Sequence, residues 1–359
     1  MKATIFPQRY PLHRPFRSSG WEIAVRDVLL LRLDDEAGHT GWGEAAPLPL
    51  FGTESLDQSW AMLREISEAE SMRRIDARGQ LEDIDAIFPA LAAAPTARFA
   101  LESALLDMRA RQQDVSLAQL LGEASPRNRI PVNAVAGGGS PAEAAAAASA
   151  ASRQGYRCIK MKVGAADPDE DAARLRALRL AVPAEMSVRL DANGAWYFNT
   201  AEHAMRLFAP YGIEYIEQPV AAEDVDELTA LTGLGIIPVA ADEAAQRLDD
   251  ARLLLQRRGV DVLVIKPMAA GGLRSVRELA CQAQAMGVDV VLTSFIDSAV
   301  GRNAVAQLCA SLPFPLRHQG LSTGSLFALD SGRDTVVEGE LRLAGGAGTG
   351  MQPELEAAS

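Results

Sequence analysis

A short apolar run with two alternating lysines, Cys158-Ile159-Lys160-Met161-Lys162-Val163, begins a regular series of strand-like segments. Each of the next four segments ends in a charged residue, namely Asp191, Glu217, Asp242 and Lys266. The steps from Lys162 onward are 29, 26, 25 and 24 residues, about the length of one strand, one helix and two loops. We therefore expect successive strands of a barrel whose C-terminal ends bring these side chains to one mouth.

The strand-like runs recur through the middle of the chain, with amphipathic helical patterns between them. They are 130–135, 157–163, 187–191, 213–217, 236–241, 260–266 and 288–293, with a shorter candidate at 315–318. Ser140-Pro141-Ala142-Glu143 is a capping-box pattern that predicts a helix over 141–154, closed by Gly155. This alternation favours a parallel sheet closed as a (β/α)8-type barrel. An open doubly wound sheet is the alternative, but Gly137-Gly138-Gly139 lacks the spacing of a dinucleotide-binding loop.

The two ends of the chain have a different pattern. Residues 1–125 contain a strand at 25–33, a returning strand at 39–44 and helical patterns at 55–69 and 95–112, which indicates a small α+β domain. Strand and turn residues at 336–341 should pack back on that domain. We divide the chain into a capping domain (1–125), a barrel (126–325) and a returning C-terminal segment (326–359).

The composition argues against several classes of protein. A net charge of −12 disfavours nucleic acid as a partner. No secretory signal is visible, and no apolar run reaches the roughly 18 residues that span a bilayer. The three cysteines are isolated, which argues against a disulfide framework or a zinc site. We expect a cytoplasmic protein with no membrane or nucleic-acid partner, and leave open whether it forms a homo-oligomer.

The charged strand ends suit a particular chemistry. Three carboxylates favour a hard divalent cation, Mg²⁺ or alternatively Mn²⁺. Turn formation alone accounts for Asp191, but not for three acids at near-equal intervals. Lys160 and Lys162 point to the same face because strand side chains alternate. Lys266 should face Lys162 across the mouth, and we expect neighbouring positive charge and partial burial to lower its pKa, as a general base requires.

Five motifs together resemble the enolase superfamily, in its muconate-lactonizing subgroup. They are Lys160-Met161-Lys162, Leu190-Asp191-Ala192-Asn193-Gly194, Ile216-Glu217-Gln218-Pro219, Ala241-Asp242-Glu243 and Ile265-Lys266. The resemblance covers nearly the whole chain. It implies an α/β fold, a (β/α)7β modified TIM barrel with an α+β capping domain to which the C-terminal segment returns.

The resemblance also implies roles for these residues. Lys162 removes the proton alpha to a substrate carboxylate, Lys266 lies opposite and stabilises the resulting anion, and Lys160 holds Lys162 and a carboxylate oxygen. Magnesium is held by Asp191, Glu217 and Asp242, and stabilises the ene-diolate. The supporting residues are Asn193 and Glu243.

Three further segments resemble the o-succinylbenzoate synthase family. They are 41–49, 293–301 and 320–323, with Thr293 and Asp297 where serine and glutamate are more familiar. The implied reaction is that of a carbon-oxygen lyase (hydro-lyase) of menaquinone biosynthesis, which dehydrates 2-succinyl-6-hydroxy-2,4-cyclohexadiene-1-carboxylate to 2-succinylbenzoate. The candidates for substrate binding are then Ser294, Phe295, Gly320 and Leu321. Loops 17–21 and 48–52 are expected to close over this small-molecule carboxylate.

Other activities use similar machinery. A racemase of N-succinylamino acids would use Lys162 and Lys266 as two opposed bases, and the motifs do not separate it from the lyase. A dipeptide epimerase is disfavoured because no Asp-x-Asp lies near the eighth strand, and a sugar-acid dehydratase because no His–Asp pair fits the later strands. His318 is a candidate supporting residue. A non-catalytic barrel that binds a small anion is the remote alternative.

Overall fold

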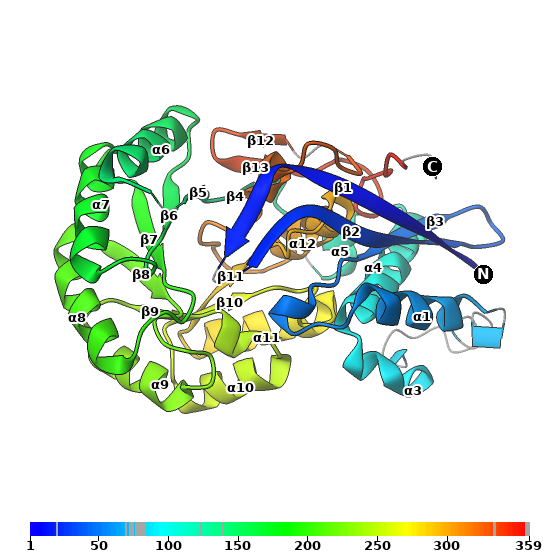
Figure 1. Ribbon diagram of the computed structural model, residues 1–359. Helices are drawn as coiled ribbons and strands as arrows, with labels where there is room; N and C mark the ends of the chain where they lie inside the picture. The colour runs from blue at the N-terminus through cyan, green and yellow to red at the C-terminus, as the bar shows by residue number, and fades with distance from the viewer. Residues whose placement is uncertain are drawn as a thin grey trace.

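The computed structural model describes residues 1–18, 21–68, 70–71, 75, 84–122, 124–137, 139–332 and 335–355, without the side chains of residues 17, 18 and 21. A curled parallel sheet with helices on its outer face lies beside a smaller cap of antiparallel strands and helices (Figure 1). This mixed α/β architecture confirms the predicted fold class.

Seven parallel strands form the barrel sheet in the order β11-β10-β9-β8-β7-β6-β5. They are β5 (Ala134–Ala136), β6 (Cys158–Lys162), β7 (Ser187–Asp191), β8 (Ile213–Glu217), β9 (Val239–Ala241), β10 (Val262–Ile265) and β11 (Asp289–Leu292). Each strand pairs with its predecessor in the sequence, so all C-terminal ends share one edge. The strand expected at 315–318 is not formed. Single bridges from Val132 to Gln319 and from Thr293 to Gly320 stand in its place.

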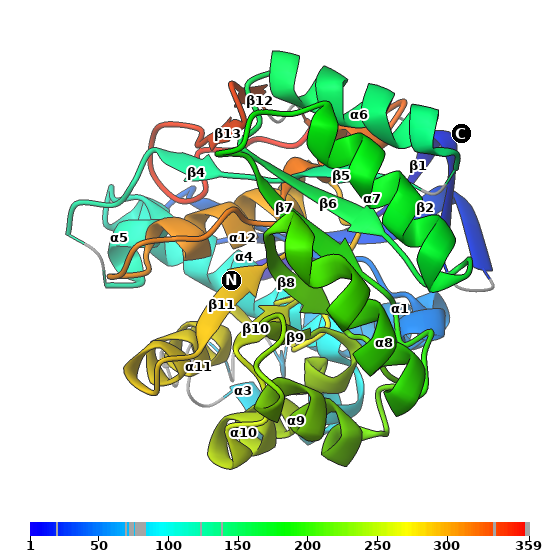
Figure 2. The same ribbon diagram turned by 90° about the vertical axis from the view of Figure 1, so that its left-hand side faces the viewer.

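Helices cover the outside of this sheet, as the turned view shows (Figure 2). They are α6 (Pro141–Arg153), α7 (Pro168–Leu180), α8 (Phe198–Phe208), α9 (Val225–Gly233), α10 (Leu248–Arg257), α11 (Leu273–Ala285) and α12 (Ala299–Ala310). The expected capping box of α6 is present between Ser140 and Glu143, and Gly155 has the left-handed φ of 84°. Every residue of α12 is buried.

The cap contains β1 (Lys2–Ser18), β2 (Trp21–Asp34) and β3 (Thr40–Ala45) with η1 (Pro49–Phe51), α1 (Leu56–Ser67), α3 (Ile84–Ile87), η3 (Pro89–Ala93), α4 (Pro95–Gln112) and α5 (Leu117–Leu120). Helix α4 packs directly on β3, and glycine makes this approach feasible. A Cβ at Gly43 would lie 1.9 Å from the carbonyl oxygen of Ala100. The Gly41-Trp42-Gly43 segment therefore fixes the cap's helix against its sheet.

The third sheet joins the C-terminal segment to the start of the barrel. It has the order β12-β13-β4, from β12 (Thr335–Val337), β13 (Glu340–Arg342) and β4 (Arg129–Pro131). The run expected as one strand at 130–135 is therefore split between two sheets. Past η6 (Ser322–Leu326), the segment also returns to the cap, where Leu117 N donates to Gly348 O at 2.7 Å. Among the described residues, no helix is both long and apolar enough to cross a bilayer.

Candidate active site

The charged residues at the strand ends meet in one cavity. Lys160 and Lys162 are on β6, and the register pairs Lys162 with Asp191 and Asp191 with Glu217 on the next two strands. Asp242 and Lys266 directly follow β9 and β10. All six side chains line the same cavity of about 120 Å³.

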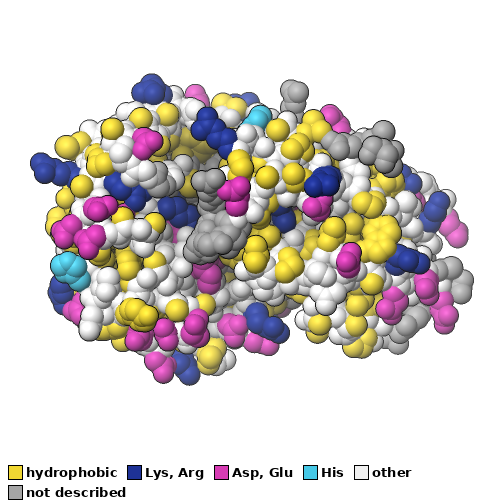
Figure 3. All heavy atoms as spheres, in the orientation of Figure 1, with side chains coloured by type: hydrophobic (Ala, Val, Ile, Leu, Met, Phe, Trp, Pro, Cys, Tyr) yellow, Lys and Arg dark blue, Asp and Glu magenta, His cyan; other side chains and the backbone are white. Residues whose placement is uncertain are grey.

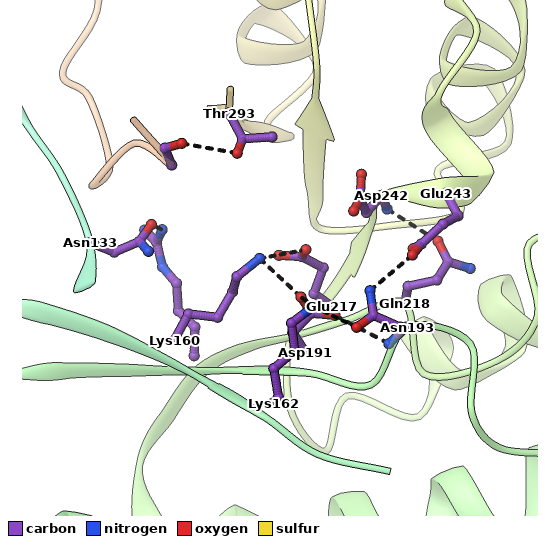
Figure 4. Close-up of polar contacts among 12 residues, drawn as sticks. Asn133, Lys160, Lys162, Asp191, Asn193, Glu217, Gln218, Asp242, Glu243 and Thr293 are labelled. Atoms are coloured by element: carbon purple, nitrogen blue, oxygen red, sulfur yellow. Dashed lines mark hydrogen bonds and ion pairs between the residues drawn. The ribbon is translucent and has the colours of Figure 1, made fainter. Parts of the chain in front are cut away.

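Each lysine in the cavity contacts a carboxylate, and Figure 4 shows Lys160 reaching two of them. Lys160 Nζ lies 2.8 Å from Glu217 Oε1 and 3.0 Å from Asp191 Oδ2. Lys162 Nζ donates to Asp191 Oδ2 at 2.8 Å. Lys266 Nζ donates to Asp242. Because Asp191 and Glu217 are only 1% exposed, these ion pairs are largely shielded from water.

The carboxylates also affect one another. Burial first, and then the negative charges of Asp191 and Asp242, raise the pKa of Glu217 well above its ordinary value. Glu217 Oε2 is buried and has no hydrogen-bond partner among the residues that the structure describes. The pKa of Asp191 is lowered, because Lys160 and Lys162 outweigh the effect of burial. Three clustered acids with one unpaired oxygen are costly without further positive charge.

The donor set fits a hard divalent cation. Three carboxylates on neighbouring strands provide only oxygen ligands, which a hard cation prefers. Glu217 Oε2, which has no partner within the described part of the chain, could bind a cation without breaking a hydrogen bond. In this arrangement the acids face the lysines, and among the described residues no three His, Cys, Asp or Glu side chains are placed so that they could hold one metal ion. Binding of a cation would therefore replace part of the lysine–carboxylate contacts.

The expected lowering of the Lys266 pKa is wrong for this arrangement. Burial disfavours the ammonium form, but the contact with Asp242 and the charge of Glu243 outweigh it and raise the pKa. The pKa of Lys160 is likewise raised, by Asp191 and Glu217 against the effect of burial. A lower pKa was expected from the neighbouring lysines and a cation, whereas here each ammonium is paired with a carboxylate.

The two expected supporting residues are in contact with each other. Asn193 Nδ2 donates to Glu243 Oε1 at 3.0 Å. Gln218 was missed as a functional residue, although it lies in the quoted Ile216-Glu217-Gln218-Pro219 motif. Its Oε1 accepts from the backbone N–H groups of Asp242 and Ala244, both at 3.1 Å. Gln218 thereby fixes the loop that carries Asp242 and Glu243.

The hydroxyl groups of Ser294 and Thr323, here called the hydroxyl wall, lie opposite the acids. Ser294 and Gly320 line the cavity, whereas Leu321 is fully buried and is not among the lining residues. Ser294 Oγ and Thr323 Oγ1 are 2.6 Å apart. Lining residues that the sequence did not single out are Asn133, Val135, Ser322 and Thr323. Ser322 and Thr323 lie in the quoted 320–323 segment, whereas Asn133 and Val135 belong to no quoted motif and only the fold brings them to the cavity. His318 is not among the lining residues either, and its carbonyl oxygen accepts from Arg189.

Aromatic side chains form the cap side of the cavity. Phe51, from the expected closing loop 48–52, meets Phe295 edge to face with ring centroids 5.7 Å apart. Lys266 Nζ lies 5.1 Å from the centre of the Phe51 ring, a cation–π distance. Leu48 N donates to Thr53 Oγ1 at 2.7 Å and closes the base of this loop. Of the other expected closing loop, 17–21, residues 17, 18 and 21 belong to the paired ends of β1 and β2, and residues 19 and 20 lie outside the described residues.

Buried charged side chains of the cap contact the segment that follows β11. Glu44 accepts from the backbone N–H groups of Ser298 and Gly301, both at 2.7 Å. Arg26 donates to Ile296 O at 2.9 Å and to Ala46 O at 2.6 Å. Ile296 itself lines the cavity. The cap strands thus position the segment that follows β11.

The overall charge of the protein would not attract an anionic substrate to the cavity. Acidic side chains gather along the lower edge of the barrel in Figure 3, over α9 and α10, and the chain carries a net charge of −12. An anionic substrate would be attracted by the lysines of the cavity and a bound cation rather than by the overall charge.

Comparison with known proteins gives consistent matches over both parts of the chain. Residues 142–358 match the family model described as enolase C-terminal domain-like, and residues 1–122 match the mandelate racemase / muconate lactonizing enzyme N-terminal domain. The L-Ala-D/L-Glu epimerase of Bacillus subtilis (strain 168) is 31% identical, over 84% of this chain and 82% of the relative. The o-succinylbenzoate synthase of Thermobifida fusca is 30% identical, over 91% of this chain and 82% of the relative. The structure of a dipeptide epimerase from Methylococcus capsulatus, complexed with Mg and a dipeptide, has a TM-score of 0.85 at 28% identity and covers 97% of this chain and 98% of that chain.

Proposed function

The chain belongs to the enolase superfamily, and from this premise we propose that it is a cation-dependent enzyme that removes the proton alpha to a substrate carboxylate. The observation that carries the proposal is the placement of Lys162 and Lys266. They come from β6 and from the end of β10, four strands apart in the curled sheet, and line one cavity together with three carboxylates.

Lys162 is the base in this proposal. Its ammonium nitrogen has two acceptors, Asp191 Oδ2 and Asn193 Oδ1, which fix where the amine points. Mg²⁺, or alternatively Mn²⁺, would be held by Asp191, Glu217 and Asp242. It would supply positive charge for the negative charge that develops on the substrate carboxylate. Lys160 would bind a carboxylate oxygen of the substrate.

The first candidate reaction is the dehydration of 2-succinyl-6-hydroxy-2,4-cyclohexadiene-1-carboxylate to 2-succinylbenzoate, a hydro-lyase reaction. Lys162 would take the ring proton and return it to the departing hydroxyl group, and Lys266 would stabilise the anion. Apolar side chains such as Val135 and Phe295 can contact the ring, and the hydroxyls of Ser294 and Thr323 can donate to the succinyl carboxylate. The relative from Thermobifida fusca supports this assignment.

Racemisation of N-succinylamino acids is the second candidate. It is favoured by Lys266, because an amine on the opposite side of the cavity can serve the other face of the alpha carbon. A dipeptide is less suitable. Among the described side chains that line the cavity, the carboxylates are only the proposed cation ligands, and no further acid is left to bind a free amino terminus.

A parallel assay tests the proposal. The purified protein with Mg²⁺ is given the cyclohexadiene carboxylate, both enantiomers of N-succinylphenylalanine, and L-Ala-L-Glu. We expect dehydration of the first, with or without racemisation of the second, and loss of both in excess chelator. Preferred turnover of the dipeptide would overturn the substrate assignment, and full activity in chelator would overturn the role of the cation.

A further inference from the structure

We propose that Asn193 is a positioning residue for Lys162, and that Glu243 sets the orientation of the Asn193 amide. The inference rests on the proposed function, in which Lys162 is the base. It gives Asn193 a role on only one side of the cavity.

The side-chain amide of Asn193 connects two charged groups. Its Oδ1 accepts from Lys162 Nζ at 2.5 Å, and its Nδ2 donates to Glu243 Oε1 at 3.0 Å (Figure 4). An ammonium can only donate and a carboxylate can only accept. A flipped amide would therefore place its NH₂ against the lysine and its oxygen against the glutamate. The two charges leave one favourable orientation.

The backbone holds both members of this pair in place. Asn193 has a left-handed φ of 46°, a conformation that asparagine tolerates better than most residues. Its N–H donates to Asp191 Oδ1 at 3.1 Å. Glu243 begins η5 (Glu243–Ala245), and Gln218 binds the backbone on either side of it. The amide is thus positioned from two loops, those after β7 and β9.

This arrangement matters because Lys162 has a long and flexible side chain. Its other acceptor, Asp191, is a proposed cation ligand, whereas Asn193 has no such second task. A misplacement of a reacting group by about 1 Å can reduce a rate by about 10²-fold. Lys266 has different contacts, with Asp242 and the Phe51 ring. Loss of the Asn193 amide should therefore affect chemistry on the Lys162 face and spare the Lys266 face.

Two kinds of variant separate this role from a merely structural one. Asn193→Gly removes the amide but accepts the left-handed backbone. Asn193→Asp keeps an acceptor for Lys162 but sets a second carboxylate against Glu243. In the double variant Asn193→Asp/Glu243→Gln, the new glutamine amide can donate to the new aspartate, so the hydrogen bond returns with reversed polarity. The exposed Asn199→Ala is the matched control.

The probes are the cyclohexadiene carboxylate and both enantiomers of N-succinylphenylalanine, each in D₂O with Mg²⁺. If the wild-type protein neither dehydrates nor exchanges the alpha proton of any probe, the proposed function itself fails. With any active probe, Asn193→Gly should lower kcat for the Lys162 reaction by about 10²-fold, with little change in KM and in Mn²⁺ affinity. Where both enantiomers exchange, only one should be slowed. The double variant should be at least about tenfold faster than Asn193→Asp.

Three results would overturn the inference while leaving the proposed function intact. The first is an unchanged kcat in Asn193→Gly. The second is an equal loss of exchange rate for both enantiomers, or a loss of Mn²⁺ affinity that parallels the loss of kcat. Either would show that the substitution acts on more than the contact between Asn193 and Lys162. The third is a double variant no faster than Asn193→Asp.

Discussion

Replacement of Glu217 by glutamine should have opposite effects on stability with and without a divalent cation. Glu217 is 1% exposed, and its Oε2 has no hydrogen-bond partner among the described residues. Burial and the charges of Asp191 and Asp242 raise its pKa. A buried unsatisfied acceptor costs about 1–3 kcal/mol. Glu217→Gln removes one negative charge at nearly constant volume, leaves an oxygen for Lys160, and replaces the unpaired oxygen by an NH₂ group that can donate to the neighbouring carboxylates of Asp191 or Asp242. In chelator, the free energy of unfolding should therefore rise by about 1–3 kcal/mol.

A bound cation should reverse this order. A ligand at one hundred times its dissociation constant stabilises the folded state by about 2.7 kcal/mol. The wild-type protein should gain about this amount from Mg²⁺, whereas Glu217→Gln should gain much less because it lacks one anionic ligand. The assay is denaturant unfolding at matched ionic strength, in EDTA and in Mg²⁺, with the exposed Glu223→Gln as the control. Equal Mg²⁺ stabilisation of all three proteins would refute the cation site.

Three further predictions concern the lysine pair, the aromatic wall and pH. Lys266→Arg keeps a cation but has no amine that can act as a base, so steady-state assays should show partial dehydration and no racemisation; retained racemisation would contradict a two-base mechanism. Phe51→Ala removes the edge contact with Phe295 and the ring beside Lys266, so kinetics should show KM raised by about tenfold with a smaller change in kcat; an unchanged KM would contradict a role in substrate binding. Burial and the charge of Asp297 raise the pKa of Glu44 from 4.5, so its protonated form favours folding and its contribution is lost as pH rises through the folded value. Between pH 4.5 and about 7, the free energy of unfolding of the wild-type protein should therefore fall more steeply than that of Glu44→Gln, by at most about 1.4 kcal/mol per pH unit; parallel curves would contradict this.

Local patterns predicted individual strands and helices best where the hydrophobic period is regular. The strands expected at 187–191 and 213–217 match β7 and β8, and the helix expected at 95–112 matches α4. These segments combine a consistent period with clear boundaries, so little depends on distant residues. The family models confirmed the membership of the enolase superfamily. The motifs that indicated it lie at strand ends that the spacing alone already predicts.

Long-range pairing explains most of what the sequence did not predict. The 130–135 run divides because β4 pairs with β13, some two hundred residues away, while β5 joins β6. The first strand, β1, was not expected at all, although it pairs with β2 along most of its length. The eighth barrel strand is reduced to bridges at Gln319 and Gly320. For none of these three features does the local sequence pattern distinguish the observed pairing from the one that was expected.

In the site, too, local spacing predicted some residues and long-range contacts determine the others. Spacing placed the acids and lysines at successive strand ends, because one strand and one helix repeat at nearly constant length. Spacing could not find the hydroxyl wall or the Glu44 contacts, because their residues come from unrelated segments; Ser294 was expected from the resemblance alone. The direction of the Lys266 pKa depends on which charge its ammonium contacts, and only the structure gives its pairing with Asp242.

Exchange of the alpha proton tests the central claim most directly. The wild-type protein, Lys162→Ala and Lys266→Ala are incubated in D₂O with Mg²⁺ and the substrate found in the parallel assay, and deuterium uptake or product formation is followed by NMR. We expect Lys162→Ala to lose on the order of 10²–10⁴-fold in rate or more while it retains Mn²⁺ affinity. A near-wild-type rate in Lys162→Ala, or exchange that depends on neither lysine, would contradict the proposed lysine base.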